Sequence, residues 1–131
     1  MEQEYIKGDI VIYDNKIHTI MDTLGVNNYE LSYISHPVHQ LELSGVPITP
    51  EILEKNGWKL HKHHKRDSYD DVSWSSYHKP AETNISLRFY TEEKAFFLFL
   101  YAEEISETPI RYIHQLQHLL FGLGLNSEME V

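Results

Sequence analysis

The chain has 131 residues, a formal net charge of −9 and 41% hydrophobic residues. A chain of this length forms one ordinary domain or two very small modules, and its apolar content is enough for a core, which argues against disorder. The sequence has no cysteine. This excludes disulfides, thiolate nucleophiles and cysteine-ligated metal centres, and it fits a reducing cytoplasm.

The charge and the hydropathy pattern also restrict the partners. An acidic surface repels phosphate backbones, so we expect no direct binding to DNA or RNA. The longest apolar run, 95–102, is too short to cross a bilayer, and the acidic amino terminus lacks the pattern of a secretion signal. We therefore expect a cytoplasmic protein with no membrane partner.

The first part of the chain is predicted to form short strands. Asp14 and Asn15 separate the first two, and both residues tolerate positive φ, which suits a two-residue hairpin turn. Closely spaced antiparallel strands predict an SH3-like barrel or a curled meander for a sub-module at 1–45. The predicted strands lie at 9–13, 16–21, 29–34 and 38–43.

A short helix is predicted next, and every position in it is consistent with that structure. Thr49 can cap the helix, Pro50 suits its first position, and Gly57 can end it in a left-handed conformation. Trp58 is then placed to close over Leu53. These residues indicate core contacts rather than catalysis.

The middle of the chain is polar, and two strong strands follow it. The basic tract 59–66 is predicted to be a solvated loop, and 72–77 an edge strand. The strands 85–90 and 95–101 are separated by polar residues that suit a hairpin connection. The second of them is apolar on both faces, so we expect it to lie centrally in its sheet.

The last predicted element is a helix that starts at Thr108, with Pro109 in its first turn and Gly122 or Gly124 as its stop. We expect its leucine face to cover the second sheet and its histidines to point outward or toward a partner. The apolar face contains Tyr112, Ile113, Leu116, Leu119, Leu120 and Leu123. The opposite face contains Arg111, His114, Gln115 and His118.

Together these elements predict an α+β protein forming a single compact domain, 1–131. Its strand-rich amino-terminal part, 1–45, is followed by a sub-module at 46–131. The second sub-module consists of the short helix and an antiparallel sheet covered by one carboxy-terminal helix.

His114 and His118 are spaced i and i+4 on the predicted helix, which lets two imidazoles bind one metal ion. The zinc-hydrolase version of this pattern needs a glutamate directly after the first histidine, and Gln115 stands there. Arg111 on the same face opposes a divalent cation, and no further ligand is evident. We therefore expect no metal, although a metal-binding and perhaps hydrolytic protein that uses His114 and His118 is the alternative.

Other catalytic patterns are missing. Ser73, Ser75 and Ser76 occur without the Gly-x-Ser-x-Gly turn of a nucleophilic serine. Gly122 and Gly124 follow a helix, whereas a dinucleotide-binding loop precedes one. The tract His61, His63 and His64 lies near Asp67, Asp70 and Asp71, and fortuitous metal binding explains it best. We predict neither enzymatic activity nor a cofactor.

Two segments resemble a group of uncharacterised small proteins from bacterial genomes and their phages or prophages. The segment 47–58, PITPEILEKNGW, matches a pattern of Pro, an apolar residue, Thr-Pro or Thr-Glu, Ile-Leu and Asn-Gly-aromatic. The segment 110–118, IRYIHQLQH, matches a pattern in which a tyrosine and an apolar residue precede His-x-Leu-Gln. His114 and Gln117 fit the second pattern, and His118 often has no counterpart in it. The resemblance implies a bacterial or phage origin and no particular chemistry.

The aromatic content, 12% of the chain, exceeds what one helix must cover. Exposed aromatic residues, with Trp74 and Tyr77 among them, form the kind of patch through which proteins bind each other. The sequence therefore predicts a non-catalytic protein-interaction or regulatory factor, of which an acidic inhibitor is one form. Its partner is another protein or, in the version easiest to test, a second copy in a homodimer.

Overall fold

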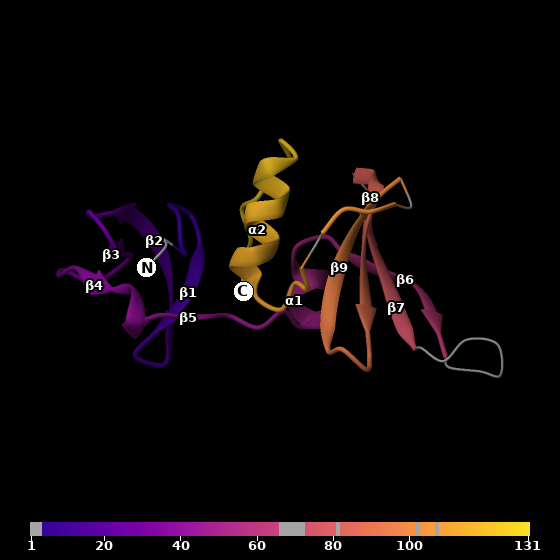
Figure 1. Cartoon of the computed structure of the whole chain (residues 1–131), viewed down its shortest axis with the longest axis horizontal. Coiled ribbons are helices and arrows are strands. Elements are labelled where there is room, and N and C mark those ends of the chain that lie inside the picture. The colour runs from indigo at the N-terminus through magenta and orange to yellow at the C-terminus, as the bar shows by residue number, and fades with distance from the viewer. Residues whose placement is uncertain (1–3, 66–72, 81, 102, 107) are drawn as a thin grey trace. The chain divides into compact units, whose positions relative to one another are not determined.

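The computed structural model describes residues 4–65, 73–80, 82–101, 103–106 and 108–131. Within these residues the strands form two five-stranded antiparallel sheets, accompanied by a short helix and a carboxy-terminal helix, so the predicted α+β class is confirmed (Figure 1). Neither described helix combines the length and the apolar composition that a membrane crossing requires. The chain divides into two compact units. The first unit is 1–47 with 112–129, and the second unit is 48–111 with 130–131.

The sheet of the first unit has the strand order β4-β3-β2-β1-β5. β5 returns to pair with β1, where Gly45 lies opposite Val11. The sheet is therefore a meander whose last strand returns to the first, as in the curled meander that the sequence offered as one possibility. The strands are β1 Ile10–Tyr13, β2 Lys16–Thr23, β3 Asn28–Leu31, β4 Val38–His39 and β5 Ser44–Gly45.

The predicted hairpin turn between β1 and β2 is confirmed. Asp14 and Asn15 have φ values of 49° and 62°, which is the double positive φ of a two-residue hairpin turn. The hairpin register follows, with Tyr13 opposite Lys16. The sheet then closes over a buried cluster formed by Tyr5, Val11, Ile20, Tyr29, Leu31 and Val38.

The strand predicted at 38–43 is wrong beyond His39. A turn of 3-10 helix, η1 (Gln40–Glu42), follows β4. The Glu42 carboxylate accepts a hydrogen bond from the His39 backbone at 3.0 Å, and His39 Nδ1 accepts one from Leu41 N at 3.1 Å. Gln40 is buried, and its Oε1 accepts from the Tyr29 hydroxyl at 2.7 Å. These side-chain hydrogen bonds replace the strand ladder.

The short helix α1 (Pro50–Lys55) confirms the predicted caps. Thr49 Oγ1 accepts a hydrogen bond from Ile52 N at 3.2 Å, and Gly57 has a φ of 88°. Trp58 N donates to Leu53 O at 2.9 Å, which completes a Schellman cap. The Leu53 and Trp58 side chains are 0% and 1% exposed.

The sheet of the second unit has the order β10-β9-β8-β7-β6, which corrects two predictions. The basic tract contributes the edge strand β6 rather than a loop, as Figure 1 shows. The predicted edge strand 72–77 is instead the inner strand β7, and Val72 lies outside the described residues. Both positions in the sheet depend on which strands pair with each other, and residue composition does not reveal this pairing. The strands are β6 Lys59–His64, β7 Trp74–Lys79, β8 Glu82–Tyr90, β9 Ala95–Leu100 and β10 Glu103–Glu104.

The carboxy-terminal helix α2 (Ile113–Gly122) has Tyr112 as its N-cap, four residues later than the predicted cap Thr108. Ile110 is held in extended conformation by an antiparallel bridge, in which it exchanges two backbone hydrogen bonds of 2.8 Å with Phe96. The predicted stop is correct: Gly124 has a φ of 74°, and Leu125 N donates to Leu120 O at 2.9 Å.

The helix α2 belongs to the first unit, whereas the sequence assigned it to the second sheet and to a sub-module at 46–131. Gln117 explains the difference. Its Oε1 accepts from Ile10 N at 3.1 Å, and its Nε2 donates to Gly8 O at 3.0 Å. Helical periodicity identifies a buried face but cannot say which sheet that face covers.

Candidate functional site

The structure buries one of the two predicted histidines. His114 is only 4% exposed, so its predicted outward orientation is wrong. Its ring meets the edge of the Tyr5 ring at 4.9 Å and stacks on Tyr112 at 5.9 Å between centroids. Burial lowers the pKa of His114 from 6.5 to about 4, with Asp9 opposing and His118 adding to that effect. The imidazole is therefore neutral at physiological pH.

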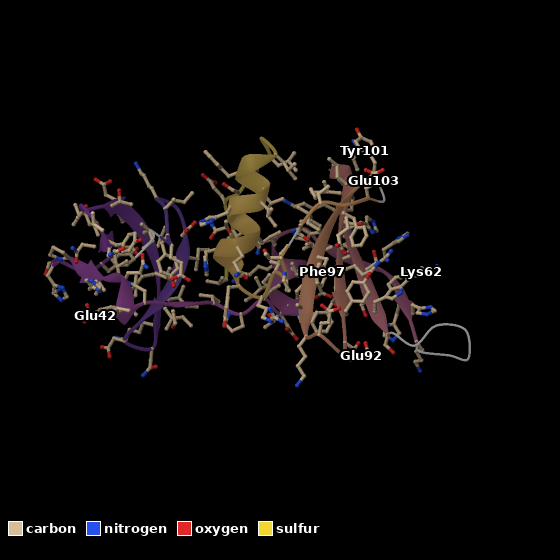
Figure 2. The ribbon with its side chains drawn as sticks, viewed as in Figure 1. Glu42, Lys62, Glu92, Phe97, Tyr101 and Glu103 are labelled. Carbon is tan, nitrogen blue, oxygen red and sulfur yellow. The ribbon has the colours of Figure 1, made fainter. Side chains whose placement is uncertain are left out.

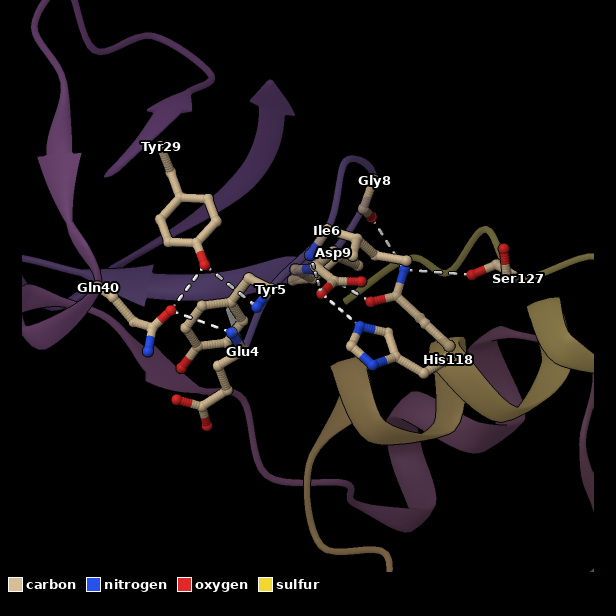
Figure 3. Close-up of polar contacts among 11 residues, drawn as sticks. Glu4, Tyr5, Ile6, Gly8, Asp9, Tyr29, Gln40, His118 and Ser127 are labelled. Atoms are coloured by element: carbon tan, nitrogen blue, oxygen red, sulfur yellow. Dashed lines mark hydrogen bonds and ion pairs between the residues drawn. The ribbon is translucent and has the colours of Figure 1, made fainter. Parts of the chain in front are cut away.

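The second histidine, His118, pairs with a buried carboxylate. Its Nε2 lies 2.6 Å from Asp9 Oδ2, and the same oxygen accepts from Ile6 N at 2.9 Å (Figure 3). The side chain of Asp9 is 2% exposed and that of His118 is 35% exposed. This pair ties α2 to the segment before β1.

The geometry around these histidines does not assemble the rival metal site. Among the residues that the structure describes, no group of three or more His, Asp or Glu side chains is placed to hold a metal ion. The Nε2 of His118 is already engaged by Asp9, and Gln115 uses its Oε1 to accept from Tyr112 N at 3.0 Å. The arrangement serves the packing of α2.

The histidines of β6 do not converge either. His63 Nδ1 lies 2.8 Å from Ser75 Oγ, whereas the His64 ring stacks on Trp74 with 5.3 Å between centroids. His61 makes an edge contact of 4.7 Å with His78. The three acidic residues that the sequence placed near this tract, Asp67, Asp70 and Asp71, lie outside the described residues.

The second sheet has two faces of different character. Strand alternation directs one set of side chains into the core, where Leu87 and Leu98 are 0% exposed. The residues that alternate with these core positions along each strand lie on the other face, and the pairing register aligns them across β7, β8 and β9. We call this surface the aromatic face; it consists of Trp74, Ser76, His78, Ser86, Arg88, Tyr90, Phe97 and Phe99. Figure 2 labels Phe97 on this sheet.

Arg88 lies at the centre of the aromatic face, opposite Ser76 on β7 and Phe97 on β9. Its guanidinium carbon is 4.1 Å from the Trp74 ring centroid and 4.6 Å from the Phe99 ring centroid. Both distances are well within the range of a cation–π interaction. The side chain of Arg88 is half-buried, so these contacts form in a partly desolvated environment.

A hollow of about 380 Å³ opens beside Arg88. Polar groups converge on it from neighbouring strands, and Phe99 and Tyr101 add two rings. The Nδ1 of His78 and the Nε of Arg88 are buried without a hydrogen-bond partner among the described residues. The polar groups of the lining come from His61, Ser76, His78, Asn84, Ser86 and Arg88.

Charge is distributed unevenly around this face. Lys62 from β6 places its Nζ 5.8 Å from the Trp74 ring centroid, and Figure 2 labels its position. At the other edge, Glu104 of β10 pairs with Phe99. The range 48–111 contains nine Lys and Arg residues and eleven Asp and Glu residues, so the charge of the face depends on where these side chains lie. The face is therefore cationic at β6 and at its centre, and acidic at β10.

Sequence reasoning found this face only in part. Trp74 was identified, but Tyr77 is 8% exposed and belongs to the core side of β7. Arg88 was not identified. The usable signal was the alternation in 86–90 and 97–99, which places Arg88 on the side away from Leu87. A scan of protein-family models and searches of curated proteins and of solved structures found no match to the chain.

Proposed function

We propose that this chain is a non-catalytic protein-interaction factor whose binding surface is the aromatic face. The observation that carries the proposal is the placement of Arg88 against Trp74 and Phe99 on a half-exposed sheet surface. Arginine and aromatic residues are the types enriched at protein interfaces and at their energetic centres. A sheet face that only contacts solvent does not require an arginine packed against aromatic rings.

A regulatory role of bacterial or phage origin is the form of this proposal that fits the rest of the chain. The first unit carries eight Asp and Glu residues against two Lys residues, so an acidic inhibitor is one version of it. The same charge disfavours a nucleic-acid partner. The absence of cysteine supports a cytoplasmic location.

Selection from a random peptide display library tests the proposal. The full chain serves as bait, and every recovered peptide is measured again on the Phe97→Ser variant. A matched control is Phe121→Ser, because Phe121 is 67% exposed and lies on α2 of the first unit. We expect peptides that lose affinity for Phe97→Ser and keep it for Phe121→Ser. Recovered peptides that bind all three proteins equally would overturn the proposal.

A further inference from the structure

The geometry points to an acidic segment of a partner protein as the occupant of the aromatic face, with a Glu or Asp carboxylate bound at the guanidinium of Arg88. This inference rests on the proposed function and deepens it. The proposed function concerns the binding surface, and this inference concerns the chemistry of the partner. The two can therefore be tested separately.

The first step is the presentation of Arg88. A guanidinium that lies against aromatic rings keeps its N–H groups at its edge, where a carboxylate can accept two of them at once. The contacts with Trp74 and Phe99, at 4.1 Å and 4.6 Å, hold the group in place before any partner arrives. Little further ordering of the side chain is then required on binding.

The second step concerns the hydrogen-bond donors of Arg88. Its hydrogen bond from Nη1 to the Tyr90 hydroxyl is a long one, at 3.4 Å. Among the described residues no carboxylate pairs with it, and its Nε has no acceptor. The Nε is buried, so an incoming carboxylate would accept from the Nη groups at the end of the guanidinium.

The third step indicates a segment with more than one acid. Lys62 lies 5.8 Å from the same Trp74 ring that Arg88 contacts at 4.1 Å. Two cations around one ring can serve two neighbouring carboxylates of an extended chain. Glu104 at the opposite edge repels acids there, so the acidic end of the segment should lie toward β6.

The other occupants fit less well. A purely apolar partner would cover Arg88 without supplying an acceptor, which leaves a desolvated charge unpaired and is costly. A nucleic acid brings a long array of phosphates to a chain with a net charge of −9. A short acidic segment carries fewer charges, so it meets the local cations with less repulsion.

The experiment uses the peptides recovered from the display library against the full chain. In each synthetic peptide, every Glu is exchanged for Gln and every Asp for Asn, one at a time, and the Kd is measured. We expect one exchange to raise the Kd by roughly tenfold or more, because a charge-assisted hydrogen bond is lost. The same exchange should have no effect on the Arg88→Gln variant. Lys94→Gln removes an exposed charge from the β8–β9 turn of the same sheet and is the control that should keep the effect.

The outcomes separate the two proposals. Peptides that lose affinity for Phe97→Ser but tolerate every acid-to-amide exchange would overturn the acidic partner and leave the interaction surface standing. Failure to recover any peptide that distinguishes Phe97→Ser from the wild type would overturn both. If Arg88→Gln does not fold, the exchanges measured on the wild-type chain decide the question.

Two further measurements exclude the other occupants. If a single-stranded oligothymidylate binds more tightly than any peptide, the partner is a nucleic acid and not a protein. Light scattering that reports a dimer for the wild type and a monomer for Phe97→Ser would make a second copy of the chain the occupant. Either result would overturn the inference.

Discussion

His118 Nε2 lies 2.6 Å from the carboxylate oxygen Oδ2 of Asp9, a residue 109 positions earlier in the chain. The carboxylate is buried and acceptor-only, so the imidazole donates to it. This contact joins the carboxy-terminal helix to the start of the first sheet. It also explains why a histidine pair with the spacing of a metal site can have a structural role.

Removal of the imidazole should destabilise the first unit. His118→Ala leaves the Asp9 carboxylate buried with a lost charge-assisted hydrogen bond, which costs about 1–3 kcal/mol. Urea unfolding measures the change. His36→Ala removes an exposed ring as a control and should have a much smaller effect. Equal stabilities for the two variants would show that the Asp9–His118 contact contributes nothing measurable.

The buried His114 predicts a pH dependence with a defined sign. Its pKa falls from 6.5 in the unfolded chain to about 4 in the folded protein, so between these values the unfolded state binds more protons. The corresponding stability is present in full above pH 6.5 and is lost as the pH falls toward 4. The slope is about 1.4 kcal/mol per pH unit, or ~2 kcal/mol between pH 6.5 and 5.

Urea unfolding at several pH values checks this expectation. His114→Phe keeps a ring beside Tyr5 and Tyr112 but cannot take up a proton, so its stability should fall less between pH 6.5 and 5. The other histidines are common to both proteins and cancel in the difference. Parallel pH profiles for the wild type and His114→Phe would show that His114 is not the source.

Sequence reasoning succeeded where the deciding contacts are local. The cap at Thr49, the left-handed Gly57 and the hairpin turn at Asp14 and Asn15 all depend on residues within a few positions of each other. Each requires a particular residue type, so the type predicts the conformation.

It failed where a distant segment decides the outcome. Thr108 satisfies every local criterion for a helix cap, but the bridge from Ile110 to Phe96 keeps the chain extended. The sheet that α2 packs against depends on two hydrogen bonds over more than a hundred residues: Gln117 donates to Gly8 O and accepts from Ile10 N. The aromatic face likewise emerges only from the pairing register of three strands.

Metal removal should leave the fold unchanged. A structural metal contributes directly to folding stability, and its ligands must converge on one point. Here His118 is engaged by Asp9, and His114 is buried against two tyrosine rings. Protein purified without a metal column should keep its Tm after treatment with a chelator. A stoichiometric metal that survives dialysis and is lost in His118→Ala would favour the metal-binding alternative.

Gly45 should be irreplaceable for a reason that its backbone conformation does not reveal. A Cβ at this position would lie 2.7 Å from Cγ and 2.9 Å from Cβ of Tyr112. Those atoms are close to the Tyr112 backbone, where the adjacent bridge to Pro47 restricts any shift. Overpacking of this kind costs about 1–3 kcal/mol, so Gly45→Ala should destabilise the first unit by that amount.

A double-mutant cycle isolates the cause. If the clash with the Tyr112 side chain is responsible, Gly45→Ala should cost much less in a Tyr112→Gly background, because Cβ, Cγ and the rest of the ring are then absent. Urea unfolding of the wild type, both single variants and the double variant gives the coupling energy.

Gly8→Ala is not a suitable control, since Gly8 has a φ of 95° and would add backbone strain. Gly122 is suitable, because an added Cβ there meets nothing within 4 Å, and Gly122→Ala should leave stability unchanged or raise it. Additive effects in the Gly45–Tyr112 cycle would place the cost of Gly45→Ala in the β5 backbone itself, against this explanation.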